Sequence, residues 1–185
     1  MTARSAPDLL AALTARTEEN LAAARRLQAL TPSALHQRPR PDAWNALECL
    51  AHLNKYSAYY LPEIRKRMAA TKHRSGTETF TSSWLGNKFA ASMKPGETMR
   101  KISSPGNANP VKHPELVTET ALPDFIKSQE ETLELLALAA HVDLTKTTTG
   151  TSLTNLIRLR LGDTLRVVVY HNWRHVEQAE LGVRN

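Results

Sequence analysis

The chain has 185 residues, a length that fits one domain, and we expect residues 1–185 to form it. Hydrophobic residues make up 41% and aromatic residues 5%, which allows a sizeable core but argues against a strand-rich sandwich or barrel. No apolar run reaches the roughly 20 residues of a membrane span, and residues 1–5 lack the apolar core of a signal peptide, so we expect a cytoplasmic protein.

The formal net charge of +6 is unevenly distributed. Residues 65–112 hold ten Lys or Arg and two Glu, a local charge of +8 that leaves −2 for the rest of the chain. A nucleic-acid-binding domain would be expected to spread its positive charge along one helix or sheet, so this distribution argues against a nucleic-acid partner. We expect the basic segment 65–112 to steer an anionic substrate or cosubstrate instead.

The first two predicted helices cover residues 7–30 and about 45–70. In the first, leucine and alanine recur at helical spacing until Thr31-Pro32 ends the pattern. The second starts at Asn45, because Asn45 and Glu48 fit a capping box in which each side chain accepts from the other residue's backbone N–H. Pro62 lies inside this helix and predicts a kink or an interruption.

A long connection separates the second and third helices. Residues 71–114 hold four of the seven glycines and four of the ten prolines, and only a short helix around residues 83–93 is predicted there. Because a long crossover returns the chain from one end of a helix of ~35 Å to the other, the second and third helices are predicted to be parallel.

The third helix is predicted from Leu122-Pro123 onward, and the sequence Thr147-Thr148-Thr149-Gly150 breaks the helical pattern. The fourth covers about residues 162–181, with Asp163 as its N-cap. The apolar stripe of the third helix is predicted to contain Phe125, Ile126, Leu133, Leu136 and Ala140.

Two histidines of the fourth helix, His171 and His175, are four residues apart and therefore share a face, as in helices that supply two imidazoles to one metal ion. They border an apolar stripe, and polar groups that face a bundle interior must be paired, which a divalent cation would do. His52 in the second helix is the obvious third ligand. The spacing also leaves open an alternative, in which the histidines are solvated or paired within the core.

The chain resembles the DinB/YfiT-like family in two motifs. Residues 44–53, WNALECLAHL, are similar to the entry of that family's second helix, and residues 171–178, HNWRHVEQ, are similar to its closing HxxxHxxQ motif. The resemblance implies an all-α four-helix bundle of up-down-down-up order, with the crossover between helices 2 and 3. It also implies one divalent metal ion held by His52, His171 and His175; zinc or nickel suits imidazole best, and iron or manganese is compatible.

The resemblance further implies a metal-dependent enzyme that acts on a small molecule. Some relatives are thiol-dependent S-transferases that use bacillithiol, mycothiol or glutathione, and we expect such an activity with a low-molecular-weight thiol. A metal-dependent hydrolase is the first alternative, and a non-catalytic metal-binding module that forms a homodimer is the second. No catalytic residue is assigned, because Ser57 stands where several relatives carry Glu.

Three further residues are candidates for the pocket. Glu48 is placed to orient His52, although its capping role is an alternative explanation, and Gln178 is placed to bind a histidine N–H or a metal-bound water, with packing as the alternative. Tyr56 is a candidate proton donor or a core aromatic. Arg174 is predicted to be a surface or interface charge.

Overall fold

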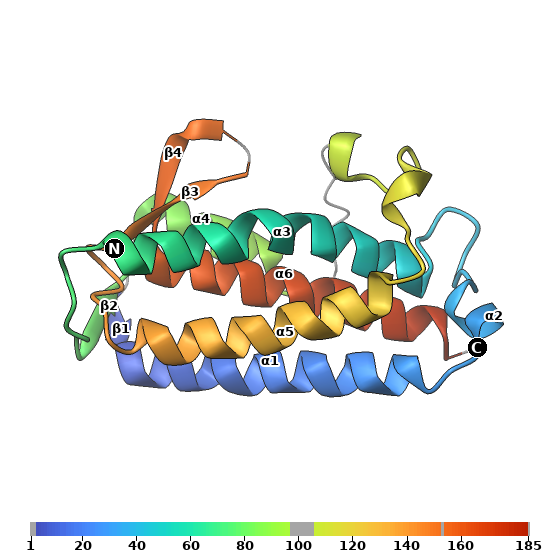
Figure 1. Ribbon diagram of the computed structural model, residues 1–185, viewed down its shortest axis with the longest axis horizontal. Helices are drawn as coiled ribbons and strands as arrows, with labels where there is room; N and C mark the ends of the chain where they lie inside the picture. The colour runs from blue at the N-terminus through green and yellow to red at the C-terminus, as the bar shows by residue number, and fades with distance from the viewer. Residues whose placement is uncertain (1–2, 97–105, 153, 185) are drawn as a thin grey trace.

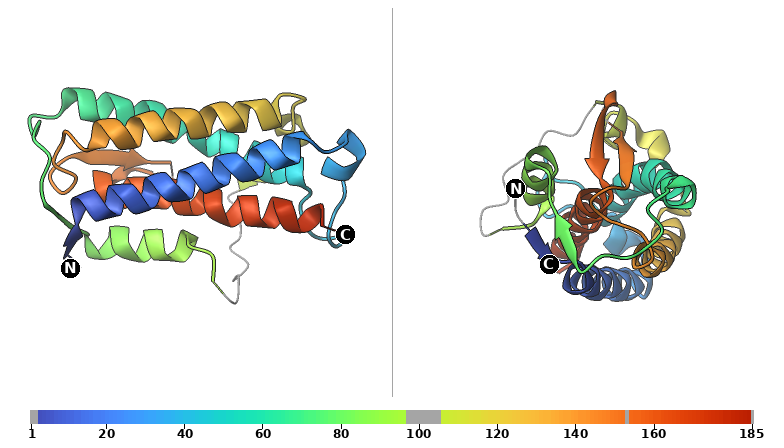
Figure 2. Two further views of the ribbon diagram at one scale, coloured as in Figure 1. Left: turned by 90° about the horizontal axis from the view of Figure 1, so that it is seen from below. Right: turned by 90° about the vertical axis from the view of Figure 1, so that its left-hand side faces the viewer.

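The computed structural model describes residues 3–96, 106–152 and 154–184, which are mostly helical (Figure 1). The four long helices are α1 (Ala6–Gln28), α3 (Ala46–Ala70), α5 (Ala121–Ala139) and α6 (Leu161–Gly182). They lie side by side; α1 and α6 run in one direction, and α3 and α5 run in the other (Figures 1 and 2). Both α1 and α3 pack against α5 and α6, so all four helices share one interior. The predicted helical class is confirmed.

Shorter elements cover the ends and one side of the long helices. The short helices are α2 (Pro32–Leu35), α4 (Trp84–Met93) and the 3₁₀ turns η1 (Gly106–Ala108) and η2 (Pro114–Leu116). The strands are β1 (Ala3–Ser5), β2 (Thr79–Thr81), β3 (Thr148–Thr151) and β4 (Thr154–Arg160). They form two antiparallel pairs, β1 with β2 and β3 with β4, which the sequence analysis did not predict. No helix in the described part of the chain combines the length and apolarity needed to cross a membrane.

Local capping determines where two of the helices begin. At the start of α3, Asn45 Oδ1 accepts from the Glu48 N–H at 2.8 Å, and Glu48 Oε2 accepts from the Asn45 N–H at 2.9 Å, so the predicted capping box is confirmed. The predicted short helix is α4, whose cap Ser83 accepts from the Gly86 N–H at 3.0 Å. α3 continues through Pro62 without interruption, because buried Leu61 and Ile64 hold that turn in the core.

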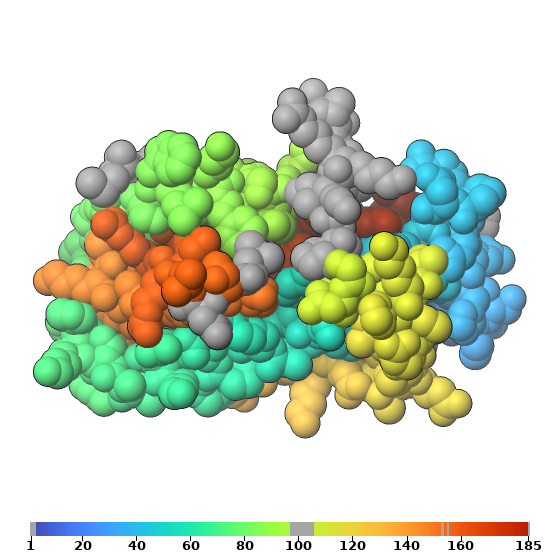
Figure 3. Space-filling model, turned by 90° about the horizontal axis from the view of Figure 1, so that it is seen from above, coloured from blue at the N-terminus to red at the C-terminus, as the bar shows by residue number. Residues whose placement is uncertain are grey.

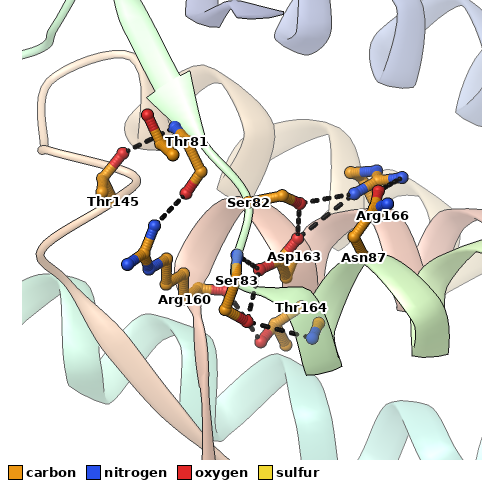
Figure 4. Close-up of polar contacts among 10 residues, drawn as sticks. Thr81, Ser82, Ser83, Asn87, Thr145, Arg160, Asp163, Thr164 and Arg166 are labelled. Atoms are coloured by element: carbon orange, nitrogen blue, oxygen red, sulfur yellow. Dashed lines mark hydrogen bonds and ion pairs between the residues drawn. The ribbon is translucent and has the colours of Figure 1, made fainter. Parts of the chain in front are cut away.

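The predicted N-cap of the fourth helix is wrong. α6 begins at Leu161, after Arg160, and Asp163 is fully buried where α6 meets the junction of β2 and α4 (Figure 4). Its Oδ2 accepts from the Ser83 N–H at 3.0 Å, and its Oδ1 lies 3.2 Å from Nη1 of Arg166. The carboxylate therefore joins α6 to α4 rather than capping its own helix.

The long helices bury two adjoining apolar clusters, one at each end of the bundle. The buried face of α5 differs from the predicted stripe: Leu135 and Ala139 are fully buried, whereas Ala140 lies beyond the last turn and is exposed. The prediction placed the stripe correctly at Phe125 and Leu136 but missed the inward face at the end of the helix.

The basic segment 65–112 is not one connection. Arg65 and Arg67 lie in the last turns of α3, where Arg65 pairs with Glu131 at 3.0 Å and Arg67 pairs with Glu63 at 2.7 Å. Two of the other basic residues, Arg100 and Lys101, lie outside the described residues. Two of the basic residues are therefore paired with carboxylates. The unpaired positive charge in the described part of this segment is smaller than the +8 counted from the sequence.

Candidate metal centre

Three histidines converge where α3 packs against α6. His52 lies in the second turn of α3, and His171 and His175 lie in successive turns of α6. One candidate ligand atom from each ring lies within 4.8 Å of the other two. Among the described residues, these histidines form the one group of three or more His, Cys, Asp or Glu side chains that lie close enough together to hold a metal ion.

Hydrogen bonds at Nδ1 determine which nitrogen two of the rings present. The Nδ1 of His52 lies 2.7 Å from the Ala108 carbonyl oxygen, which can only accept, so Nδ1 carries the proton. The Nδ1 of His175 lies 3.0 Å from Oε1 of Gln178 and donates in the same way. A neutral imidazole that is protonated at Nδ1 has its lone pair at Nε2, so both rings present Nε2 as a ligand.

The distances and the donor set fit a divalent ion. Nε2 of His52 lies 3.2 Å from Nε2 of His171. A tetrahedral ion with nitrogen bonds of ~2.1 Å separates its ligands by about 3.4 Å, which is close to this distance. The lone pair of His52 Nε2 needs a proton or a cation as its partner. A metal ion between the two rings would bind the Nε2 atoms of His52 and His171 at once.

Burial keeps the three imidazoles neutral. It lowers the pKa of His171 to about 3, with smaller contributions from His52 and Arg174. Burial also holds the pKa of His175 well below its usual range and lowers that of His52, although the bond from His52 to Ala108 opposes the change. At neutral pH the rings are therefore in the protonation state that binds metal ions.

Aromatic rings surround the histidines. The ring of Trp44 stacks on His175 with a centroid distance of 5.7 Å and lies 5.0 Å from His52. The ring of Tyr56 meets His52 and His171 edge-on at 4.9 and 5.0 Å. Burial, and to a smaller extent Tyr60, raises the pKa of Tyr56, so its hydroxyl stays protonated. These two rings form apolar walls, which limit access of water and strengthen electrostatic interactions inside.

The family model described as the DinB superfamily matches residues 13–179, a range that contains all three histidines. The chain belongs to the DinB superfamily. No curated protein and no solved structure matches it significantly. Membership in the DinB superfamily and the histidine group together fit a metal-binding protein.

Two other candidates of this DinB-superfamily chain have different surroundings. Gln178 contacts His175, as described above. Glu48 has no hydrogen bond to His52 among the described contacts, because one of its oxygens accepts from the Asn45 N–H and the other from Arg38. The atom that orients His52 is instead the carbonyl oxygen of Ala108 in η1.

Sequence reasoning missed two contributors to the centre. Ala108 acts through its backbone in an irregular segment, so no side-chain motif could have revealed it. Arg174 is 8% exposed, not a surface charge, and its guanidinium helps to lower the pKa values of His171 and His175. Arg174 lies three residues after His171, so the two side chains share a helix face, and this spacing could have indicated that Arg174 lies near the histidines.

Proposed function

We propose that this chain is a metal-dependent enzyme in which His52, His171 and His175 bind one divalent ion and a low-molecular-weight thiol is the cosubstrate of an S-transfer reaction. The observation that carries the proposal is the convergence of three neutral imidazoles, two of which present Nε2 because Ala108 and Gln178 hold their Nδ1 protons. Three protein ligands leave coordination positions for a small molecule, as in catalytic rather than structural sites.

The residues around the histidines favour a thiol over water. The candidate ligand group contains no carboxylate among the described residues, and hydrolysis commonly uses a carboxylate base to deprotonate its water. A free thiol has a pKa near 8.5, so it ionises on a cation without such a base. A divalent ion bound by the histidines would supply the Lewis acidity that lowers this pKa further.

The remaining residues act on the geometry and solvation of the site. Ala108 and Gln178 orient two of the rings, and Trp44 and Tyr56 restrict water. The Tyr56 hydroxyl, which burial keeps protonated, serves as a hydrogen-bond donor to the charge that develops on the electrophilic substrate. The family's up-down-down-up order is part of the proposal, supported by the opposite directions of α1 and α6 relative to α3 and α5 (Figure 1).

Metal content tests the ligand set. Protein purified without an affinity tag and loaded with zinc should hold about one ion per chain, because one group of three histidines provides one site. His171→Ala should lose most of this metal after dialysis, whereas His141→Ala should keep it, because His141 is exposed and outside the group. Equal metal content in the two variants would exclude His171 as a ligand.

Thiol binding tests the reaction class. Cobalt-substituted protein should change its visible spectrum in a saturable way when glutathione, mycothiol or bacillithiol is added, because a thiolate sulfur entering the coordination sphere alters the ligand field. No change with any of these thiols would shift the assignment to a hydrolase. A coordination sphere that is already closed by protein atoms would favour the non-catalytic module.

A further inference from the structure

A second concave site lies between α4 and the β3–β4 hairpin, with a volume of about 280 Å³. Figure 3 views the face of the molecule on which these two elements meet. Leu85, Lys88 and Phe89 contribute one face of α4, and Thr151, Ile157 and Leu159 contribute the hairpin. Apart from Lys88 and the hydroxyls of Thr151 and Ser92, the lining is hydrocarbon, and the volume is just below that of typical small-molecule sites, which start at about 300 Å³.

Both walls of this groove are held by contacts outside it. α4 is tied to α6 through Asp163, which accepts from Ser83, and through Arg166, which donates to Asn87 Oδ1 at 3.0 Å (Figure 4). The hairpin is tied to α3 by the Tyr59 hydroxyl, which donates to the Thr151 carbonyl at 2.9 Å. Both walls are therefore fixed to the long helices, and a groove that is formed before binding reduces the entropic cost of binding.

Lys88 is the one charged side chain in the described lining of the groove, and the carboxylates of Glu63 and Asp163 contact Gly150 and Ser83 outside this lining. Residues 84–96 and 148–160 carry Lys88, Lys94, Arg158 and Arg160 and no carboxylate. The Nζ of Lys88 lies 5.2 Å from the centre of the Trp84 ring, and no ion pair within the described residues involves Lys88. An apolar groove with an unneutralised ammonium group in its lining is complementary to a molecule with a hydrocarbon body and an anionic end.

We propose that this groove binds a small amphipathic carboxylate, with its hydrocarbon chain against Phe89 and Ile157 and its carboxylate on Lys88. The lining residues on α4 extend from Leu85 to Ser92, about 10 Å along the helix axis, which matches an extended alkyl chain of about eight carbons. A second copy of the chain fits less well, because a two-fold interface over the groove would bring two Lys88 groups together without a carboxylate.

The groove lies beside α6, the helix that carries two of the three histidines. Phe89 and Ile157 of the groove and Tyr170 of α6 pack against the same buried cluster, which consists of Ala90, Leu159 and Val167. Val167 in this cluster lies one helical turn, ~6 Å along the axis, before His171. The binding site itself does not depend on the proposed function.

Calorimetric titration of the full chain tests the site. Dissociation constants for butanoate, hexanoate and octanoate should fall by roughly fourfold per methylene, because each added CH₂ enters apolar surroundings. Octan-1-ol should bind about threefold to fivefold more weakly than octanoate, because it cannot pair with Lys88. Lys88→Met should remove this preference, whereas Lys94→Met, which changes a lysine outside the groove lining, should preserve it.

The same titration separates this proposal from the function proposed above. His171→Ala should keep octanoate affinity within about twofold while it loses metal, because it alters no groove-lining side chain. Affinity that is independent of chain length, no saturable binding up to millimolar octanoate, or equal effects of Lys88→Met and Lys94→Met would overturn the proposal. Self-association that Lys88→Met strengthens and octanoate does not reverse would also overturn it, because a second copy would then cover the groove.

Discussion

The buried ion pair that joins α6 to α4 leads to a sharp stability prediction. Asp163→Asn keeps the side-chain volume but removes the charge next to Arg166, whose side chain is only 5% exposed. Oδ1 of Asp163 accepts from Ser82 and Arg166, and Oδ2 accepts from the N–H and hydroxyl of Ser83 at 3.0 and 3.2 Å. Because asparagine has one oxygen, its NH₂ group must face donors on one of these two sides.

We expect Asp163→Asn to lower the free energy of unfolding by about 3–5 kcal/mol, because a buried guanidinium loses its counter-ion and two donors lose an acceptor. For a chain of this size, the loss corresponds to a Tm lower by roughly 10 °C. Urea denaturation followed by far-UV circular dichroism measures it. Asp124→Asn, in the exposed first turn of α5, is the control and should cost less than about 1 kcal/mol. Equal losses in the two variants would refute the role of the buried pair.

Two further predictions concern the histidines. Metal-free protein should lose stability as the pH falls from 7 to 5. The pKa of His171 is about 3 in the folded state and ~6.5 when unfolded, so the unfolded chain binds more protons in this range and this histidine alone costs about 2 kcal/mol at pH 5. Urea midpoints that do not change between pH 7 and 5 would contradict this. Gln178→Leu should weaken zinc affinity about 10- to 100-fold in a chelator competition, because the Nδ1 proton of His175 loses its acceptor. Gln28→Leu, at the exposed end of α1, is the matched control, and equal affinities in both variants would show that Gln178 does not support the site.

Local rules predicted much of the helical framework. The capping box at Asn45 and Glu48 depends on residues three apart, so the start of α3 could be predicted from four letters of sequence. The shared helix face of His171 and His175 also follows from their spacing. That His52 meets them depends on how α3 packs against α6, and the family resemblance supplied that information.

Features set by distant partners could not be predicted in this way. Asp163 has the sequence position of an N-cap, but its carboxylate accepts from Ser82 and Ser83, about 80 residues earlier in the chain. The β3–β4 hairpin is anchored by Tyr59 and Glu63 of α3, about 90 residues earlier in the chain, and the sequence around Gly150 showed only a break in helical pattern. Where a segment's contacts are non-local, sequence periodicity carries little information about its structure.

X-ray absorption spectroscopy of zinc-loaded protein tests the central claim most directly, because it identifies the atoms bound to the metal. The account predicts three imidazole nitrogens at ~2.0–2.1 Å together with an exchangeable oxygen, and replacement of that oxygen by a sulfur at ~2.3 Å when a thiol cosubstrate is added. A zinc ion without three imidazole ligands, or a coordination shell that no thiol changes, would contradict it.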